Sequence, residues 1–312
     1  MTSDDRTAAA RLALLGLRGP DGGWGYRRGA ASCAEPTALA GLALLATDPS
    51  EGGPRAAAAA GLAAAADWLT TLQRADGSLG VSASSPSPGW MTPYAVLFWK
   101  ALGVHEGRTR SASGWLLGQK GRTLDRADDP TKVAGHDTTL VGWPWVEDTH
   151  SWLEPTAMAV LALGRLGLGG HPRVREGLRL IRDRAVEPGG WNYGNKSVFG
   201  RPLRPQPAPT GLALLTLAGT GPRTADIGRA VRYLADALPG IRASASLGWG
   251  LVGLRAWGET PDGSDAWLSE AVVGLADRPD AAPKLACLLL ASGGRTLELF
   301  GRVPVAEPAE TR

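Results

Sequence analysis

The sequence is poor in cysteine and in long apolar runs, and each shortage excludes a class of protein. Two cysteines, Cys33 and Cys287, are too few for a disulfide framework. No uninterrupted apolar stretch reaches the ~18 residues that a membrane-spanning helix needs. The first segment, Met1–Arg11, is charged rather than apolar, which is not typical of a secretory signal. We therefore expect a cytoplasmic protein.

Concentrated charge is also missing. The net charge is only +3, and the arginines are spread along the chain instead of forming a stripe. This distribution argues against a nucleic-acid partner. What is abundant is glycine, with 43 residues, and tryptophan, with 12 against only 3 phenylalanines. The tryptophans recur at particular positions, which prompts a search for repeats.

Six apolar segments resemble one another and predict buried helices. Five of them have proline at the second position, where it gives up no hydrogen bond and its fixed φ suits the start of a helix. Each continues for about three turns with apolar residues on every face, as is typical of a buried helix. The segments begin at Glu35, Thr92, Glu154, Ala208, Ser246 and Ala282.

An amphipathic segment precedes each apolar one. In the clearest example, Ile227, Val231 and Leu234 fall on one helical face, with Arg229 and Arg232 elsewhere. This spacing predicts a surface helix that is apolar on one side. Similar patterns occupy 62–72, 174–185 and 268–275, and less regular ones occupy 8–17 and 110–119.

Six such pairs predict an all-α fold, a single (α/α)6 toroid of six helical hairpins. An apolar helix cannot be buried by one partner, whereas a ring gives it two neighbours and an outer layer. Because every pair has the same order, the inner helices should run parallel, with their N-termini at one end. We expect one domain over residues 1–301 and a flexible C-terminal tail over 302–312.

The connecting loops carry a second recurring signature. Gly22–Tyr26 and Gly189–Tyr193 both place an aromatic residue directly after two glycines. Glycine just past a helix end permits the left-handed cap. Asp76–Gly80 and Gly142–Trp145 fall at the equivalent place in two other pairs.

At these loops and helices the sequence resembles the prenyltransferase and squalene-oxidase repeat superfamily. Trp68–Gly80, with Gln73, is similar to the glutamine–tryptophan repeat of triterpene cyclases, with Leu79 in the tryptophan position. Trp115–Gln119 looks like another such fragment, and the likeness spans Arg11–Leu299. The resemblance implies a terpene cyclase-like α/α toroid.

One segment resembles the catalytic motif of class II terpene cyclases, an Asp-x-Asp-Asp sequence followed by Thr-Ala. Here Trp152–Ala157 matches it, and Glu154 falls on the catalytic acid, while Trp152 and Pro155 replace the flanking aspartates. The resemblance implies an isoprenoid-binding enzyme that starts cyclisation by protonation at a hydrophobic cavity. No segment matches the zinc ligands of protein prenyltransferases, so we expect no metal and no cofactor.

Two glutamates stand at the same register of their repeats. Glu35 and Glu154 each follow a loop tryptophan, Trp24 or Trp143, by eleven residues, so the ring should bring both to one end. Six helix N-termini meet there, which would attract an anion such as diphosphate. Alternatively, each glutamate only complements its own helix end. His150, four residues before Glu154, is a candidate helper.

Aromatic residues near this end are candidates for binding substrate, because aromatic faces stabilise cations. The alternative is that loop tryptophans staple outer helices together, which we favour for Trp24 and Trp191. The candidate substrate-binding residues are Trp152, Trp143, Trp145, Trp90, Trp249, Tyr94 and Tyr26.

Two further groups are compatible with metal chemistry but have simpler interpretations. The aspartates within 125–129 resemble the magnesium motif of class I terpene synthases, or else belong to an exposed loop. Cys33 and Cys287, with His150 or His136, would be neighbours in a closed ring and could bind zinc, or are ordinary buried thiols.

The leading functional hypothesis is an isoprenoid cyclase with Glu154 as general acid and Glu35 and His150 as helpers. Its partner would be an isoprenoid or other apolar small molecule, and a homodimer or a partner toroid chain could complete the cavity. One alternative is a non-catalytic toroid that binds a lipid or a protein segment. The other is a carbohydrate-active toroid, which needs two carboxylates about 5 to 10 Å apart across a cleft.

Overall fold

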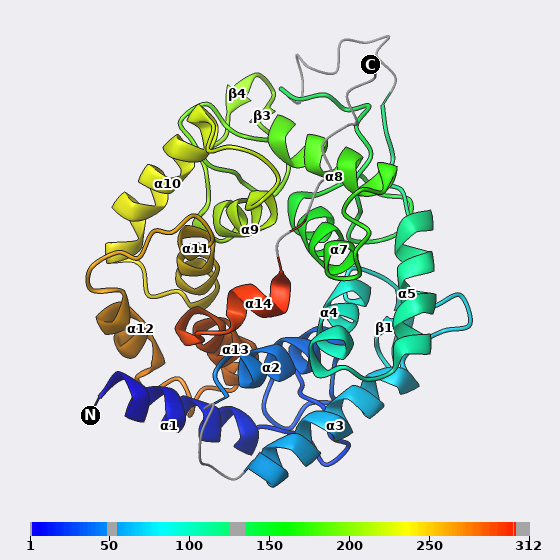
Figure 1. Ribbon diagram of the computed structural model, residues 1–312, viewed down its shortest axis with the longest axis vertical. Helices are drawn as coiled ribbons and strands as arrows, with labels where there is room; N and C mark the ends of the chain where they lie inside the picture. Colours follow the sequence, from blue (N-terminus) through cyan, green and yellow to red (C-terminus); the bar gives the residue numbers. More distant parts are fainter. Residues whose placement is uncertain (1, 49–54, 125–134, 302, 304–312) are drawn as a thin grey trace.

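The protein folds as two concentric layers of helices around one axis (Figure 1). The computed structural model describes residues 2–48, 55–124, 135–301 and 303. None of the helices in these ranges is long and apolar enough to span a membrane. Of the predicted tail, Val303 is buried in the core, and residues 302 and 304–312 lie outside the described residues.

The inner layer is a closed ring. Each inner helix packs on the next one along the chain, and the last packs on the first. Gly211 and Gly253 bring two of them into backbone contact, because a Cβ at Gly211 would overlap the carbonyl of Trp249. The inner helices are α2 (Ala34–Ala46), α4 (Thr92–Leu102), α7 (Leu153–Arg165), α9 (Pro207–Leu217), α11 (Ser244–Ala256) and α13 (Ala281–Ser292).

The outer layer consists of the amphipathic helices. In α10, Ile227, Val231 and Leu234 are buried, as their spacing predicts, and Thr224 caps the N-terminus through the backbone N–H of Ile227. A 3-10 turn at Leu238–Gly240 follows it. The outer helices are α1 (Ser3–Gly16), α3 (Arg55–Thr71), α5 (Glu106–Gly118), α8 (Pro172–Asp183), α10 (Ala225–Ala237) and α12 (Ser264–Val272).

The strict outer–inner alternation confirms the predicted toroid with parallel inner helices. We call the end where the inner helices begin the mouth. The loops that enter the inner helices lie on this face, and two of them form antiparallel hairpins. These hairpins are β1 (Gly80–Ser82) with β2 (Ser85–Pro88), and β3 (Ser197–Val198) with β4 (Arg201–Pro202).

A threonine in the first turn of an inner helix fixes each recurring loop. Its hydroxyl accepts a hydrogen bond from the backbone N–H of the loop residue in the tryptophan position. The pairs are Trp24–Thr37, Leu79–Thr92, Trp143–Thr156 and Trp191–Thr210, at 2.8 to 3.0 Å. Leu79 makes the same bond as the tryptophans, which supports its assignment to the tryptophan position.

The end opposite the mouth is closed by the chain itself. The short helix α14 (Thr296–Phe300) turns back from α13 and contacts α2, α4, α7 and α11. Phe300 is buried and meets the ring of Trp249 edge-on, with centroids 5.6 Å apart. Beyond it, Val303 packs over Gly164. α14 and Val303 therefore plug this end of the ring.

Candidate active site

Two carboxylates lie at the mouth. Glu35 is the second residue of α2, Glu154 is the second residue of α7, and α4 packs between these two helices. Both glutamates are partly exposed. Glu35 is close enough to act electrostatically on Glu154, and both act on Tyr94. The arrangement follows from the repeat, because the same register puts both side chains on the first turn of parallel helices.

Glu35 is held by two donors from different loops. Its Oε2 accepts a hydrogen bond of 2.6 Å from the Tyr26 hydroxyl and one of 2.9 Å from Nε1 of Trp90. Tyr26 belongs to the loop before α2, and Trp90 lies just before α4. The two hydrogen bonds tie Glu35 both to the loop before α2 and to the residues that lead into α4.

Glu154 has a different environment. Its Oε1 accepts a hydrogen bond of 3.0 Å from the hydroxyl of Tyr94, the third residue of α4. Its Oε2 has no hydrogen-bond partner among the described residues. Burial, followed by repulsion from Glu35, raises the pKa of Glu154 from 4.5 to about 7, against the lowering effect of the Tyr94 hydroxyl. At neutral pH this carboxyl is therefore present in both protonation states.

The neighbouring weak acids stay protonated. Burial, then the negative charges of Glu154 and Glu35, hold the pKa of Tyr94 well above its ordinary value. The pKa of Tyr26 is raised in the same way by burial and by Glu35. Burial raises the pKa of the Cys287 thiol to about 12. Glu154 is therefore the group in this cluster that can exchange a proton at physiological pH.

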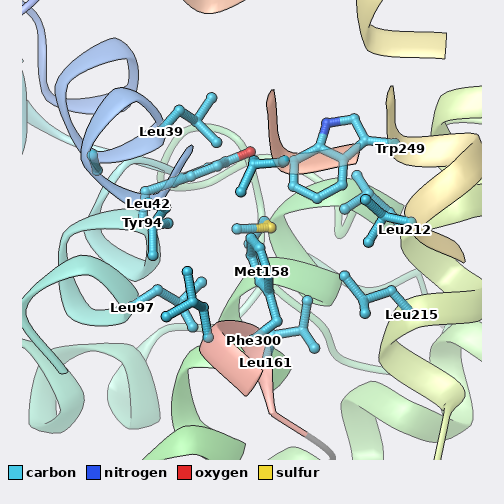
Figure 2. Packing of buried hydrophobic residues seen from close by; sticks show 14 of the residues in the cluster. Leu39, Leu42, Tyr94, Leu97, Met158, Leu161, Leu212, Leu215, Trp249 and Phe300 are labelled. Carbon is cyan, nitrogen blue, oxygen red and sulfur yellow. The ribbon is translucent and has the colours of Figure 1, made fainter. Parts of the chain in front are cut away.

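Below the carboxylates the inner wall is apolar. Figure 2 shows side chains of α2, α4, α7, α9 and α11, together with Phe300, that point toward the ring axis. None of them is more than 5 % exposed, so they fill the axis and exclude water from it. The labelled residues of this wall are Leu39, Leu42, Tyr94, Leu97, Met158, Leu161, Leu212, Leu215, Trp249 and Phe300.

Three of the predicted aromatic residues stand at the rim of the mouth. Trp90 and Trp145 meet edge to face, with ring centroids 5.3 Å apart. They line a narrow pocket that continues to Pro155, the residue after Glu154. Trp152, the N-cap residue of α7, packs against Gly194 and is partly exposed.

Two predicted site residues are not brought to the carboxylate pair. Trp143 donates its indole N–H to Leu116 of α5 at 2.8 Å and stacks under the guanidinium of Arg173. It therefore staples the outer layer, as Trp24 does through Leu14 and Trp191 through Ile181. His150 is exposed in the loop before α7, and its side chain makes no hydrogen bond or ion pair with any described residue.

The metal alternatives gain no support. Within the described ranges, no three histidine, cysteine or acidic side chains are grouped so that they could hold a metal ion. Cys33 and Cys287 both lie near Glu35, but the exposed His150 does not join them. The aspartates at 125, 128 and 129 lie outside the described residues.

Sequence reasoning missed part of the site. Tyr94 was expected to bind substrate, but its hydroxyl holds the candidate acid. Met158, Leu39 and Leu212 line the wall and were not singled out. All three lie between one and two turns into an inner helix, and this shared position could have identified them as residues of the wall. Phe300 could not be placed, because it follows the last repeat and has no counterpart in the other five.

No known family model and no curated protein matches the sequence. Solved structures do match. The type II terpene cyclase MstE from Scytonema superposes with a TM-score of 0.57 and 20 % identity, over 89 % of this chain and 80 % of that chain. A protein from Actinoplanes gives a TM-score of 0.56 at 19 % identity, over 90 % and 82 % of the two chains.

A functionally distinct protein also shares this architecture. Salmonella alpha-2-macroglobulin matches with a TM-score of 0.51 and 16 % identity, over 92 % of this chain but only 17 % of its own. Similarities at such low identity concern the fold, which serves several functions. The resemblance seen in the sequence is thus confirmed at the level of structure: the chain has the α/α-toroid fold found in type II terpene cyclases.

Proposed function

We propose that this protein is an enzyme that binds an isoprenoid substrate and starts its cyclisation by protonation, with Glu154 as the general acid. The observation that carries the proposal is the environment of Glu154: a pKa raised to about 7 at the edge of a wholly apolar wall. A general acid works best when its pKa lies near the pH at which it operates. A carboxyl with the ordinary pKa would be almost fully ionised there.

In the proposed reaction the O–H bond of Glu154 breaks, and its proton forms a new C–H bond with one carbon of a substrate double bond. The neighbouring carbon becomes a tertiary cation, which the next double bond attacks to close a ring. Loss of a proton from the final cation restores an alkene, so the net reaction is an isomerisation. The unpaired Oε2 of Glu154 is the oxygen available to carry the transferred proton.

The other residues of the cluster would support this step. Tyr94 fixes the carboxyl through Oε1 and leaves Oε2 free to face substrate. Glu35 is held by Tyr26 and Trp90, and repulsion from Glu35 helps to raise the pKa of Glu154. Trp249 and Tyr94 place aromatic rings in the wall at the axis, where a cation–π contact would be worth roughly 2 kcal/mol once substrate displaces the side chains that fill it.

The structural neighbours agree with this substrate class. Variants of MstE have been solved with geranylgeranyl dihydroxybenzoate as substrate and with merosterolic acid A as product. Both ligands derive from an isoprenoid chain. The match covers 80 % of the MstE chain, so most of that enzyme has a counterpart in this single toroid.

The test is incubation of the protein with geranylgeranyl dihydroxybenzoate in ²H₂O, followed by mass spectrometry. Proton-initiated cyclisation predicts a product of unchanged elemental composition that carries one solvent deuteron. Glu154→Gln should give no product. Absence of product from the wild-type protein with this compound and with shorter prenyl compounds would count against the proposal.

A second candidate is a non-catalytic toroid, and the filled axis favours it. α14 and Val303 occupy the end opposite the mouth, and Phe300 packs against Trp249 of α11. In this alternative the apolar centre is completed by the chain's own C-terminal segment, and the mouth binds a lipid or a protein segment without reaction. A compound that binds and is recovered unchanged, equally by wild type and Glu154→Gln, would support it.

A carbohydrate-active toroid has less support. The two carboxylates are present, but the surface beneath them is apolar instead of a polar groove. Sugars need hydrogen-bonding groups for several hydroxyls, and the wall residues labelled in Figure 2 supply only the Tyr94 hydroxyl and the Trp249 indole N–H.

A further inference from the structure

Exposed apolar side chains gather on the mouth face. Eight large apolar residues are exposed among the described residues, and six of them belong to segments that lead from an outer helix to the next inner helix. The other two, Leu12 and Leu297, lie on α1 and α14. The six are Leu124, Val146, Tyr193, Val198, Phe199 and Val273. One end of the ring therefore carries most of the exposed apolar surface.

Phe199 is the extreme member of this set. The sequence has three phenylalanines. Phe98 and Phe300 are buried in the core, whereas Phe199 is 90 % exposed at the tip of the β3–β4 hairpin. Val198 and Tyr193, also exposed, belong to the same loop between α8 and α9.

The backbone at this tip is unfavourable for phenylalanine. Val198 pairs with Arg201, and the two residues between them, Phe199 and Gly200, have φ of 48° and 73°. Positive φ at both central positions is the type I′ turn, which favours Asn-Gly or Gly-Gly. Phe199 therefore exposes an aromatic ring to water and also occupies a backbone conformation that is unfavourable for phenylalanine.

The hairpin is a braced structure. The backbone N–H of Leu203 donates to Lys196 at 2.8 Å and continues the β3–β4 pairing, while Gln206 donates to Trp191 at 2.8 Å and ties the end of the loop to its beginning. The Tyr233 hydroxyl donates to Pro205 at 2.9 Å. Phe199 is thus held outward by hydrogen-bonded backbone on both sides.

The charge around the tip is of one sign. Residues 188–206 contain three basic residues and no acidic one. Arg201 and Arg204 are exposed and Lys196 is partly exposed, and none of the three forms an ion pair among the described residues. An aromatic tip flanked by unpaired cations matches the interface of an anionic lipid bilayer, where aromatic rings insert and basic side chains meet headgroups.

We propose that the β3–β4 hairpin docks the protein on an anionic membrane surface by inserting Phe199, with Lys196, Arg201 and Arg204 at the headgroups. Docking in this orientation turns the mouth toward the bilayer, where apolar molecules concentrate. The docking does not depend on catalysis by Glu154, so either proposal can fail without the other.

The experiment is flotation of the full chain with vesicles of phosphatidylcholine alone or mixed in equal parts with phosphatidylglycerol. We expect binding to the mixed vesicles that is lost in high salt. Phe199→Asn should weaken it about tenfold, because the inserted aromatic surface is gone. Asparagine suits the I′ turn, so the hairpin itself is retained. Arg201→Gln together with Arg204→Gln should weaken binding by a similar factor.

The matched control is Leu12→Gln, which removes an exposed apolar side chain from the outer helix α1 and should bind like the wild type. Equal binding by Phe199→Asn and wild type would overturn the proposal. So would failure of the wild type to bind mixed vesicles. Light scattering that shows a dimer broken by Phe199→Asn, without vesicle binding, would assign the face to a second copy of the chain instead.

Discussion

Tyr94 on α4 donates a hydrogen bond of 3.0 Å to Glu154 on α7, so the candidate acid of one repeat is held by the preceding inner helix. Glu35 on α2 is held from the opposite direction, by Trp90 just before the following inner helix α4, at 2.9 Å. The segment 90–94 therefore supplies a donor to each carboxyl group. This arrangement makes the properties of Glu154 depend on residues that can be changed one at a time.

The first prediction concerns the hydroxyl of Tyr94. That hydroxyl is the one influence that lowers the pKa of Glu154. Tyr94→Phe keeps the ring in the wall but removes the donor, so we expect the pKa of Glu154 to rise further above 7. Titration of ¹³C-labelled glutamate carboxyls by NMR measures it. A lower pKa in the variant would show that the hydroxyl does not stabilise the ionised form.

The second prediction is that Glu35→Gln lowers the pKa of Glu154, since repulsion from Glu35 helps to raise it. Glutamine still offers one oxygen to Tyr26 and Trp90, which limits the structural change. The same NMR titration measures the effect. An unchanged pKa would mean that burial alone accounts for the perturbation.

The third prediction concerns stability as a function of pH. The pKa of Glu154 is about 7 in the folded protein against 4.5 for an ordinary glutamate, so the folded state keeps a proton that the unfolded chain releases in this range. Below pH 4.5 the Glu154 carboxyl is protonated in both the folded and the unfolded chain and does not affect stability. As the pH rises from 4.5 through about 7, the free energy of unfolding falls by up to about 3 kcal/mol.

Glu154→Gln removes that penalty. Its free energy of unfolding should be equal to or slightly below that of wild type in acid, where a helix-end cap is worth about 1 kcal/mol at most, and should exceed it at about pH 8. Urea denaturation at both pH values measures the difference, and comparison with wild type cancels the other titrating groups. A difference that is the same at both pH values would contradict the raised pKa.

The fourth prediction addresses the loops. Thr156→Val leaves the buried backbone N–H of Trp143 without its 3.0 Å acceptor, which should cost about 1 to 3 kcal/mol. Because Thr37 and Thr210 make the same bond to Trp24 and Trp191, their valine variants should lose similar amounts by urea denaturation. A loss of stability only in Thr156→Val would mean that the threonine hydrogen bond does not stabilise the loops of the other repeats.

The fifth prediction addresses the plug. Phe300→Ala should cost about 3 to 5 kcal/mol, because the side chain is buried against Trp249. Leu297→Ala, on the same short helix but 38 % exposed, is the matched control and should cost less than about 1 kcal/mol. Similar losses at both positions would show that α14 is not seated in the ring.

The sequence predicted what the repeat determines. The apolar helices follow from a pattern that recurs six times, five times with an early proline, and the common position of Glu35 and Glu154 follows from their register in it. The same logic should have placed Trp143 in the outer layer. It precedes Thr156 by 13 residues, as Trp24 precedes Thr37, so the staple expected for Trp24 applied equally to it.

What could not be predicted depends on contacts between repeats. The bond from Tyr94 to Glu154 joins residues 60 positions apart, and its existence depends on the rotation of α4 and α7 about their axes. Neither rotation follows from the apolar pattern, because these helices are buried on every side. The plug formed by Phe300 and the turn at Phe199 occur once each and have no repeat to reveal them.

The central claim is that Glu154 is a carboxyl group that holds a proton near neutral pH. NMR titration of ¹³C-labelled glutamate, with Glu154→Gln to assign its signal, tests this most directly. We expect one carboxyl signal that titrates near pH 7 and is missing from the Glu154→Gln spectrum. If the signal that disappears in the variant titrates near 4.5 like an ordinary glutamate, Glu154 is a helix-end charge and not an acid.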